Sequence, residues 1–337
     1  MTATAVPYLE AQPLDETLLQ GARNALGAGL GLEAGDRFVL LAQRGHEPIG
    51  RALLEASQEL RLDLQAYLFE AEQAESAALT TRLEQQLLDA QGSVLVGGFE
   101  LPMGFRRRVV RTRRERRHGH MIGTTEAMMR QAMRVDMGEV HALGDRLIAR
   151  LQPARRLFVT SGAREPLRCE VAGVRWHNES GRLRARGSTN LPAGEVVCSP
   201  TSVTGRLRAA GGVHLPGGEI FGRDGRLELV FRGGRLVDAE GPDGERVLAA
   251  ARRVAEGDRV GQLAFGTNVG VLTPIGSVLQ DMKMPGCNLV LGYTAPEHTG
   301  APWSCTQMIP VLCRRPDVRS EQGALLTGGR YVDALFA

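Results

Sequence analysis

The sequence has no apolar run that approaches the roughly 20 residues needed to span a bilayer as a helix. Its first residues, MTATAVPYLEAQPLDE, are acidic and lack the basic-then-apolar pattern of a secretory signal. The five cysteines form no CxxC pair, and their odd number is typical of reduced thiols in a cytosol. We therefore expect a cytoplasmic protein without a membrane segment.

Aromatic residues are also scarce, at 4%, and none lies within the run RRRVVRTRRERR at 106–117. This run carries eight arginines and one glutamate in a chain whose net charge is only +3. Without aromatic side chains to stack on bases, we expect an acidic partner for it and no nucleic acid. If the run is helical, Arg107, Arg111 and Arg114 share one face and can bind carboxylates. The alternative is a solvated face without a partner.

The first third of the 337 residues alternates between strand and helix patterns. Buried strands are expected at 35–43, 62–69 and 93–99, with amphipathic helices between them. This order implies a small parallel sheet with right-handed crossovers, and hence an α/β doubly wound domain over residues 1–122. A helical pattern at 123–152 predicts a connector.

From Arg156 onward the pattern changes to short alternating strands broken by glycines, with one clear helix at 245–258. Turns every 8–12 residues are typical of antiparallel structure. We therefore expect a β-rich α+β domain over residues 153–337. Within it, the stretch 261–310 holds three glycine-punctuated blocks. Four amides are dotted through them, Gln262, Asn268, Asn288 and Gln307, which suggests a pocket without acid–base chemistry.

Several strings in this second half resemble one family in order. STNLPAGEVVCSP at 188–200, GQLAFGTN at 261–268, DMKMPGCNLVLG at 281–292 and SCTQMIPV at 304–311 are similar to motifs of the thermophilic, AmpS-like metallo-aminopeptidases. The resemblance implies an aminopeptidase-like fold, a two-domain homodimer, and a two-metal site in the β-rich domain.

The resemblance also assigns the metal ligands, and most of them are replaced. One carboxylate is retained as Glu195, whereas the second falls on Gln262. The two histidine ligands fall on Asn288 and Gln307, and an aspartate falls on Ile309. Because metals of this class are held by imidazole and carboxylate, we expect no metal, no cofactor and no catalytic residue of the family. Dihydroxypyridine dioxygenase relatives of the family need two histidines and an aspartate at similar positions, and these are missing too.

A retained cleft lined by Glu195, Gln262, Asn288 and Gln307 is expected to bind a peptide backbone, with Trp303 as an apolar anchor. The alternative is that these side chains satisfy one another in a collapsed site. The chain thereby resembles metal-less relatives that bind precursor peptides in ribosomal natural-product pathways such as that of the crocagins.

Two further alternatives stay open. The first is a metal-free enzyme that uses Glu195 as a base with Cys287 or Lys283 nearby, and the second is a purely structural subunit. His118 and His120 are the candidates for a relocated metal site, or else part of a solvated basic segment.

Overall fold

The computed structural model describes residues 5–111 and 116–336 and divides into two compact units. Unit 1 comprises the chain up to His141 together with Gly181–Ala193, and unit 2 comprises Ala142–Ser180 and the chain from Gly194 onward. Residues 181–193 therefore belong to unit 1, although they lie in the second half of the sequence. None of the helices in the described ranges is long and apolar enough to cross a bilayer.

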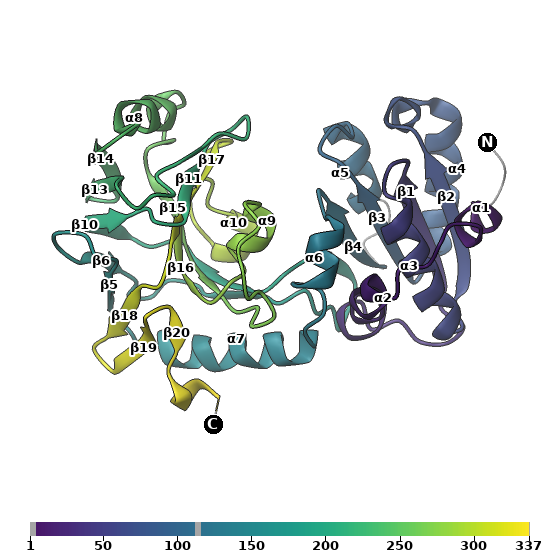
Figure 1. The fold of residues 1–337 in the computed structure, drawn as a ribbon, viewed down its shortest axis with the longest axis horizontal. Coiled ribbons are helices and arrows are strands. Elements are labelled where there is room, and N and C mark those ends of the chain that lie inside the picture. The colour runs from purple at the N-terminus through teal and green to yellow at the C-terminus, as the bar shows by residue number, and fades with distance from the viewer. Residues whose placement is uncertain (1–4, 112–115, 337) are drawn as a thin grey trace. The chain divides into compact units, whose positions relative to one another are not determined.

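Unit 1 is built on a five-stranded sheet in the order β2-β1-β3-β4-β8, with every neighbouring pair parallel (Figure 1). Its strands are β1 (Arg37–Gln43), β2 (Asp63–Phe69), β3 (Gly92–Gly97), β4 (Arg117–Ile122) and β8 (Gly187–Asn190). Its helices are α1 (Val6–Glu10), α2 (Glu16–Arg23), a π-helix (Asn24–Gly29), α3 (Glu47–Glu59), a 3₁₀ turn (Ala71–Glu75), α4 (Ala77–Asp89), α5 (Met103–Arg111) and α6 (Glu126–Arg130). The three predicted strands therefore form, and two further strands extend the sheet.

Alternate residues of β1 divide the core of unit 1 into two layers, because successive side chains of a strand point to opposite faces. Phe38 and Leu40 pack with α2 and α3 on one face, whereas Val39 and Leu41 pack with α4 and α5 on the other. Helices on both faces keep this parallel sheet buried. The α/β class expected from the sequence is confirmed.

Helix α7 (Met137–Leu151) begins in unit 1 and ends in unit 2. Unit 2 is a sandwich of two antiparallel sheets, in the orders β14-β13-β10-β6-β5-β18-β19-β20 and β12-β11-β17-β16-β15-β9-β7. The strands of the first sheet are β5 (Arg156–Thr160), β6 (Leu167–Glu170), β10 (Ser202–Arg208), β13 (Glu228–Arg232), β14 (Arg235–Glu240), β18 (Asp317–Ser320), β19 (Gly323–Thr327) and β20 (Arg330–Tyr331). Those of the second are β7 (His177–Glu179), β9 (Glu195–Cys198), β11 (Gly212–His214), β12 (Ile220–Phe221), β15 (Val260–Gly266), β16 (Gly286–Gly292) and β17 (Met308–Cys313).

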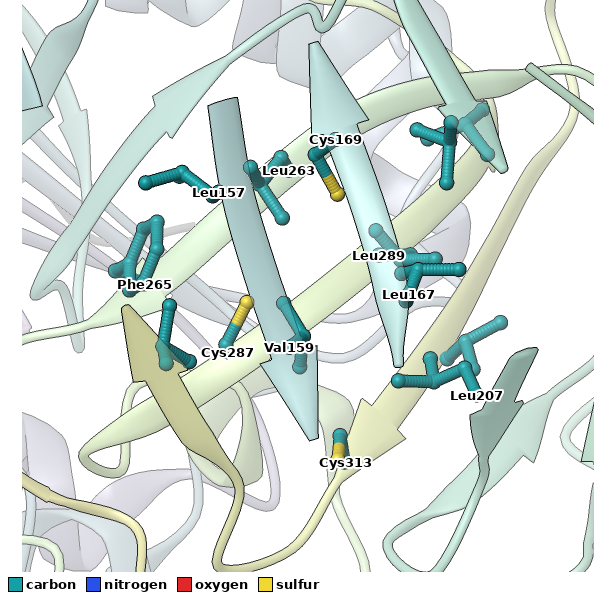
Figure 2. Packing of buried hydrophobic residues seen from close by; sticks show 14 of the residues in the cluster. Leu157, Val159, Leu167, Cys169, Leu207, Leu263, Phe265, Cys287, Leu289 and Cys313 are labelled. Atoms are coloured by element: carbon teal, nitrogen blue, oxygen red, sulfur yellow. The ribbon is translucent and has the colours of Figure 1, made fainter. Parts of the chain in front are cut away.

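The main core of unit 2 lies between these sheets. Figure 2 shows Leu157, Val159 and Leu167 of the first sheet against Leu263, Phe265 and Leu289 of the second. The short helices α8 (Gly244–Arg252), α9 (Val278–Asp281) and α10 (Pro296–Thr299) and a 3₁₀ turn (Asp333–Leu335) complete the unit. The β-rich α+β class expected for the second half is confirmed.

Candidate functional site

Glu195 is held at the start of β9 by the glycine before it and by its neighbouring strands. Gly194 has φ of +124°, and a Cβ atom there would lie 2.7 Å from Cβ of Asn268. A side chain at position 194 would therefore clash as well as strain the backbone. In the sheet, Glu195 lies opposite Gly266 of β15 and Glu179 of β7. The NLPAGEV and GTN motifs thus meet in space, and together they fix the position of this carboxylate.

The partner of Glu195 is Lys283, the only lysine among the 41 basic residues of the chain. Its Nζ donates a hydrogen bond to Oε2 of Glu195, in an ion pair whose side chains are 11% and 6% exposed. The other oxygen, Oε1 of Glu195, has no hydrogen-bond partner in the described part of the chain. An ammonium group therefore neutralises the one carboxylate that the metal-site resemblance leaves in place.

Burial raises the pKa of Glu195, while the ammonium of Lys283 opposes this rise and the nearby Glu179 adds to it. The pKa of Lys283 is also raised: burial lowers it, but the negative charges of Glu195 and Glu179 outweigh burial. With two carboxylates facing one ammonium group, the lysine stays charged at neutral pH. Lys283 is therefore a fixed cation, and a neutral amine nucleophile is not available here.

The three amides assigned to ligand positions are buried, and each donates to a backbone carbonyl of unit 2. Nε2 of Gln262 donates to Tyr293 O at 3.1 Å, and Nδ2 of Asn288 donates to Met282 O at 3.2 Å. Asn288 also accepts a hydrogen bond from the Cys313 backbone. Nε2 of Gln307 donates to Ala251 O at 3.2 Å. Each amide side chain therefore anchors a backbone segment of unit 2 by a hydrogen bond.

The strand register separates these residues along the sheet. Glu195 lies level with Gly286 of β16, because both pair with Gly266. Gln307 precedes Met308, which pairs with Gly292, six residues further along β16. At about 3.3 Å per residue, roughly 20 Å separate the two levels. The structure therefore brings Glu195 and Lys283 together and places Gln307 elsewhere; that all these residues bind one partner stays a prediction.

The remaining candidates of this region lie in two different settings. Ile309 is fully buried in the sandwich core, and Cys287 is 2% exposed there, on the other face of β16 from Asn288. Burial raises the pKa of the Cys287 thiol well above its ordinary value, which leaves it protonated. Trp303 is half-buried, and the guanidinium of Arg259 lies 4.1 Å from its ring centroid.

The donor set does not fit the two-metal site that the resemblance implies. Its one carboxylate is bound to an ammonium group, its amides are engaged with backbone carbonyls, and Ile309 has no donor atom. Among the residues that the structure describes, no group of three or more His, Cys, Asp or Glu side chains is arranged to hold a metal ion. No step of a metal-assisted hydrolysis can be derived from these residues.

A cavity of about 470 Å³ opens beside Asn288 on the face of the second sheet that points away from the main core. Its walls are largely apolar and include Val269, Val271, Leu272, Pro274, Met284 and Leu312. Three exposed arginines, Arg314, Arg315 and Arg330, also line it, and none of them forms an ion pair within the described ranges. The carboxylate of Asp281 at the same cavity accepts the Ile275 and Gly276 backbone N–H groups, both at 2.9 Å. The cavity thus combines an apolar wall with unpaired positive charge.

Two solved structures share this fold over nearly the whole chain. A 2,5-dihydroxypyridine dioxygenase from Pseudomonas putida KT2440 matches with a TM-score of 0.67 at 17% identity, over 95% of this chain and 98% of the other. AmpT from Thermus thermophilus matches with a TM-score of 0.66 at 18% identity, over 94% and 99% of the two chains. The chain has an AmpT-like fold. At such identity the likeness establishes the fold alone. No protein-family model and no curated protein matches the sequence.

The arginine run is helical in its first part. Helix α5 ends at Arg111, and Arg107 and Arg111 lie one turn apart with exposed side chains. Arg114 lies outside the described residues.

His118 and His120 lie on β4, next to β3 and within unit 1, where a solvated segment was one expectation. That expectation is wrong for His118, which is 1% exposed and whose Nδ1 lies 2.9 Å from Oγ of Ser93. Burial lowers the pKa of His118 well below its ordinary value and lowers the pKa of His120 to about 4. Both rings are therefore neutral at pH 7.

We expect unit 1 to lose stability as the pH falls from about 6.5 to about 4. Between these pH values the unfolded chain binds a proton at each of the two histidines, whereas the folded unit does not. The stabilisation is therefore fully present above the histidine pKa of the unfolded chain, and it is lost as the pH falls below that pKa. For His120 alone the loss reaches roughly 3 kcal/mol. Urea midpoints from circular dichroism near pH 7 and near pH 4.5 measure it, and His120→Asn should narrow the difference. An unchanged difference in that variant would contradict the assignment.

Proposed function

We propose that this AmpT-like chain is a peptide-binding protein without peptidase activity, and that its ligand is an acidic peptide. The arginine-lined cavity beside Asn288 carries the proposal. Its volume of about 470 Å³ accommodates one or two apolar side chains, and its unpaired arginines supply charge-assisted hydrogen bonds to carboxylates.

The Glu195–Lys283 pair supports the absence of hydrolysis. A metallopeptidase needs a metal-bound water and a carboxylate free to take its proton. Here the ammonium group of Lys283 already binds and neutralises that carboxylate through Oε2. The binding role that remains is that of an accessory protein for a precursor peptide in a ribosomal natural-product pathway, in keeping with the crocagin-type resemblance of the sequence. We also propose that the chain forms a homodimer, as its resemblance to the aminopeptidases implies.

Titration with a synthetic peptide of alternating glutamate and leucine residues, with a free C-terminal carboxylate, tests the proposal. We expect saturable binding that weakens as salt is raised, because exposed charges are screened. Mass spectrometry after prolonged incubation with added Zn²⁺ or Mn²⁺ should recover the peptide unchanged. Cleavage of the peptide would contradict the proposal, and chemical change without added metal would favour the metal-free enzyme instead. Precursor peptides encoded beside the gene are the next ligands to test.

A further inference from the structure

A second cavity in unit 2, of about 400 Å³, lies on the same face of the second sheet as the arginine-lined cavity. Along β17, Met308 and Pro310 line the second cavity, and Leu312 lines the arginine-lined one. Alternate residues of a strand share a face, and the residues between them, Ile309 and Val311, belong to the main core. Both cavities therefore open on the outer face of β17.

Two other elements also contribute to both cavities. Strand β11 lies next to β17 (Figure 1), with Gly211 just before it at the arginine-lined cavity and His214 at its end in the second. Helix α9 supplies Asp281 to the arginine-lined cavity and Val278 to the second. The two cavities therefore adjoin along three shared elements.

Strand β17 sets the spacing between the cavities. At about 3.3 Å per residue, Leu312 lies roughly 7 Å from Pro310 and roughly 13 Å from Met308. An extended peptide has nearly the same rise per residue, and its alternate side chains also point to one side. Two side chains that are two or four positions apart in such a peptide can therefore enter the two cavities at once.

Apolar side chains and one cation form the accessible wall of the second cavity. Met308 and Val254 are 43% and 37% exposed. The other apolar residues that line it are Leu215, Pro216, Val278 and Pro310. The exposed Arg253 also lines it and forms no ion pair in the described ranges. Because the arginine-lined cavity likewise combines apolar wall with unpaired positive charge, the same kind of ligand fits both.

We propose that the second cavity is a subsite for an apolar side chain of the acidic peptide, two or four residues away from the apolar side chain in the arginine-lined cavity. The subsite rests on the proposed function and adds the length and pattern of the ligand, an extended segment of about three to five residues in which apolar and acidic residues alternate. The apolar side chain removes Met308 and Val254 from water, and Arg253 binds a carboxylate of the same segment.

Peptides of matched length and charge test the subsite on the full chain. The core peptide Glu-Leu-Glu, with blocked ends, is extended at either end by Leu-Glu-Leu or by Ala-Glu-Ala. We expect the leucine extension to bind roughly tenfold more tightly than the alanine extension at one of the two ends, because only leucine fills the second cavity. The end that shows the gain gives the direction of the bound peptide.

Two methionines report which cavity is filled. Met284 lines the arginine-lined cavity, and Met308 lines the second. With ¹³C-methyl-methionine labelling, the core peptide should move the Met284 resonance, and the leucine extension should move the Met308 resonance as well. The variants Met284→Leu and Met308→Leu assign the two signals. A Met308 resonance that does not respond to the leucine extension would overturn the subsite.

Variants at the exposed rim locate the gain in affinity. Met308→Ala together with Val254→Ala should remove most of the advantage of leucine over alanine, whereas Leu272→Ala at the arginine-lined cavity should weaken both extensions equally. If the core peptide binds but leucine gives no advantage at either end, or if the advantage survives the rim variant, the second cavity is not a subsite and the proposed function stands. If none of the peptides binds, the proposed function is wrong, and the subsite falls with it.

Discussion

Replacing Lys283 with methionine is expected to lower the free energy of unfolding of unit 2 by about 3–5 kcal/mol. The substitution leaves Glu195 buried, with a 6% exposed side chain and no cation beside it. Urea denaturation followed by tryptophan fluorescence measures the effect, because Trp176 and Trp303 are the only tryptophans and both lie in unit 2. The loss should shrink at acidic pH, where Glu195 takes up a proton and no longer carries a buried charge.

Two controls separate the buried pair from ordinary surface charge. Arg226→Met breaks the pair with Asp224, in which the two side chains are 71% and 45% exposed, and should leave the stability of unit 2 nearly unchanged. The double variant Glu195→Gln with Lys283→Met should be more stable than Lys283→Met alone, because it removes the unpaired charge. If the double variant is no more stable than the single one, Lys283 does not act through Glu195.

The single lysine also allows a direct view of the charge. Selective ¹⁵N-lysine labelling gives one side-chain nitrogen to observe, since the chain has no other lysine. We expect an ammonium signal that persists as the pH is raised towards 10, because the pKa of Lys283 is raised above its ordinary value. A neutral amine at pH 7 would contradict the ion pair.

Local patterns were sufficient to predict the α/β unit as far as β3. Its strands are continuous apolar runs and its helices are amphipathic, so each element carries its own signal. Strands β4 and β8 carry none. β4 begins inside the arginine run, and β8 pairs with it through residues about 70 positions later in the chain. Their place depends on tertiary pairing, which sequence periodicity does not encode.

The candidate site, too, could be predicted from the sequence only in part. The motifs that contain Glu195 and Lys283 were visible, and the presence of only one lysine in the whole chain was an available signal of a special role for it. The distance between Glu195 and Gln307 depends on strand register, which one sequence does not reveal. The sequence did not predict that arginines line the cavity. Arg314 and Arg330 reach the same cavity only because the β18–β19–β20 hairpins fold the chain back on itself.

Charge reversal at the cavity, with Arg314→Glu and Arg330→Glu together, is expected to weaken binding of the acidic peptide by roughly 10²- to 10³-fold. Each substitution removes a charge-assisted hydrogen bond and adds a repulsion to the ligand's carboxylates. Fluorescence anisotropy with a labelled peptide measures the affinity. Both positions are exposed and lack ion pairs in the described part of the chain, so folding should be preserved.

The matched control is Arg107→Glu with Arg111→Glu on α5, which changes the net charge of the protein by the same amount. General electrostatic attraction falls equally in the two double variants, so the difference between them reports the contact itself. A large loss in the cavity variant alone places the peptide beside Asn288. A large loss in the α5 variant alone places it on the arginine helix and contradicts the cavity as the binding site. Equal small losses would show that neither surface holds the carboxylates.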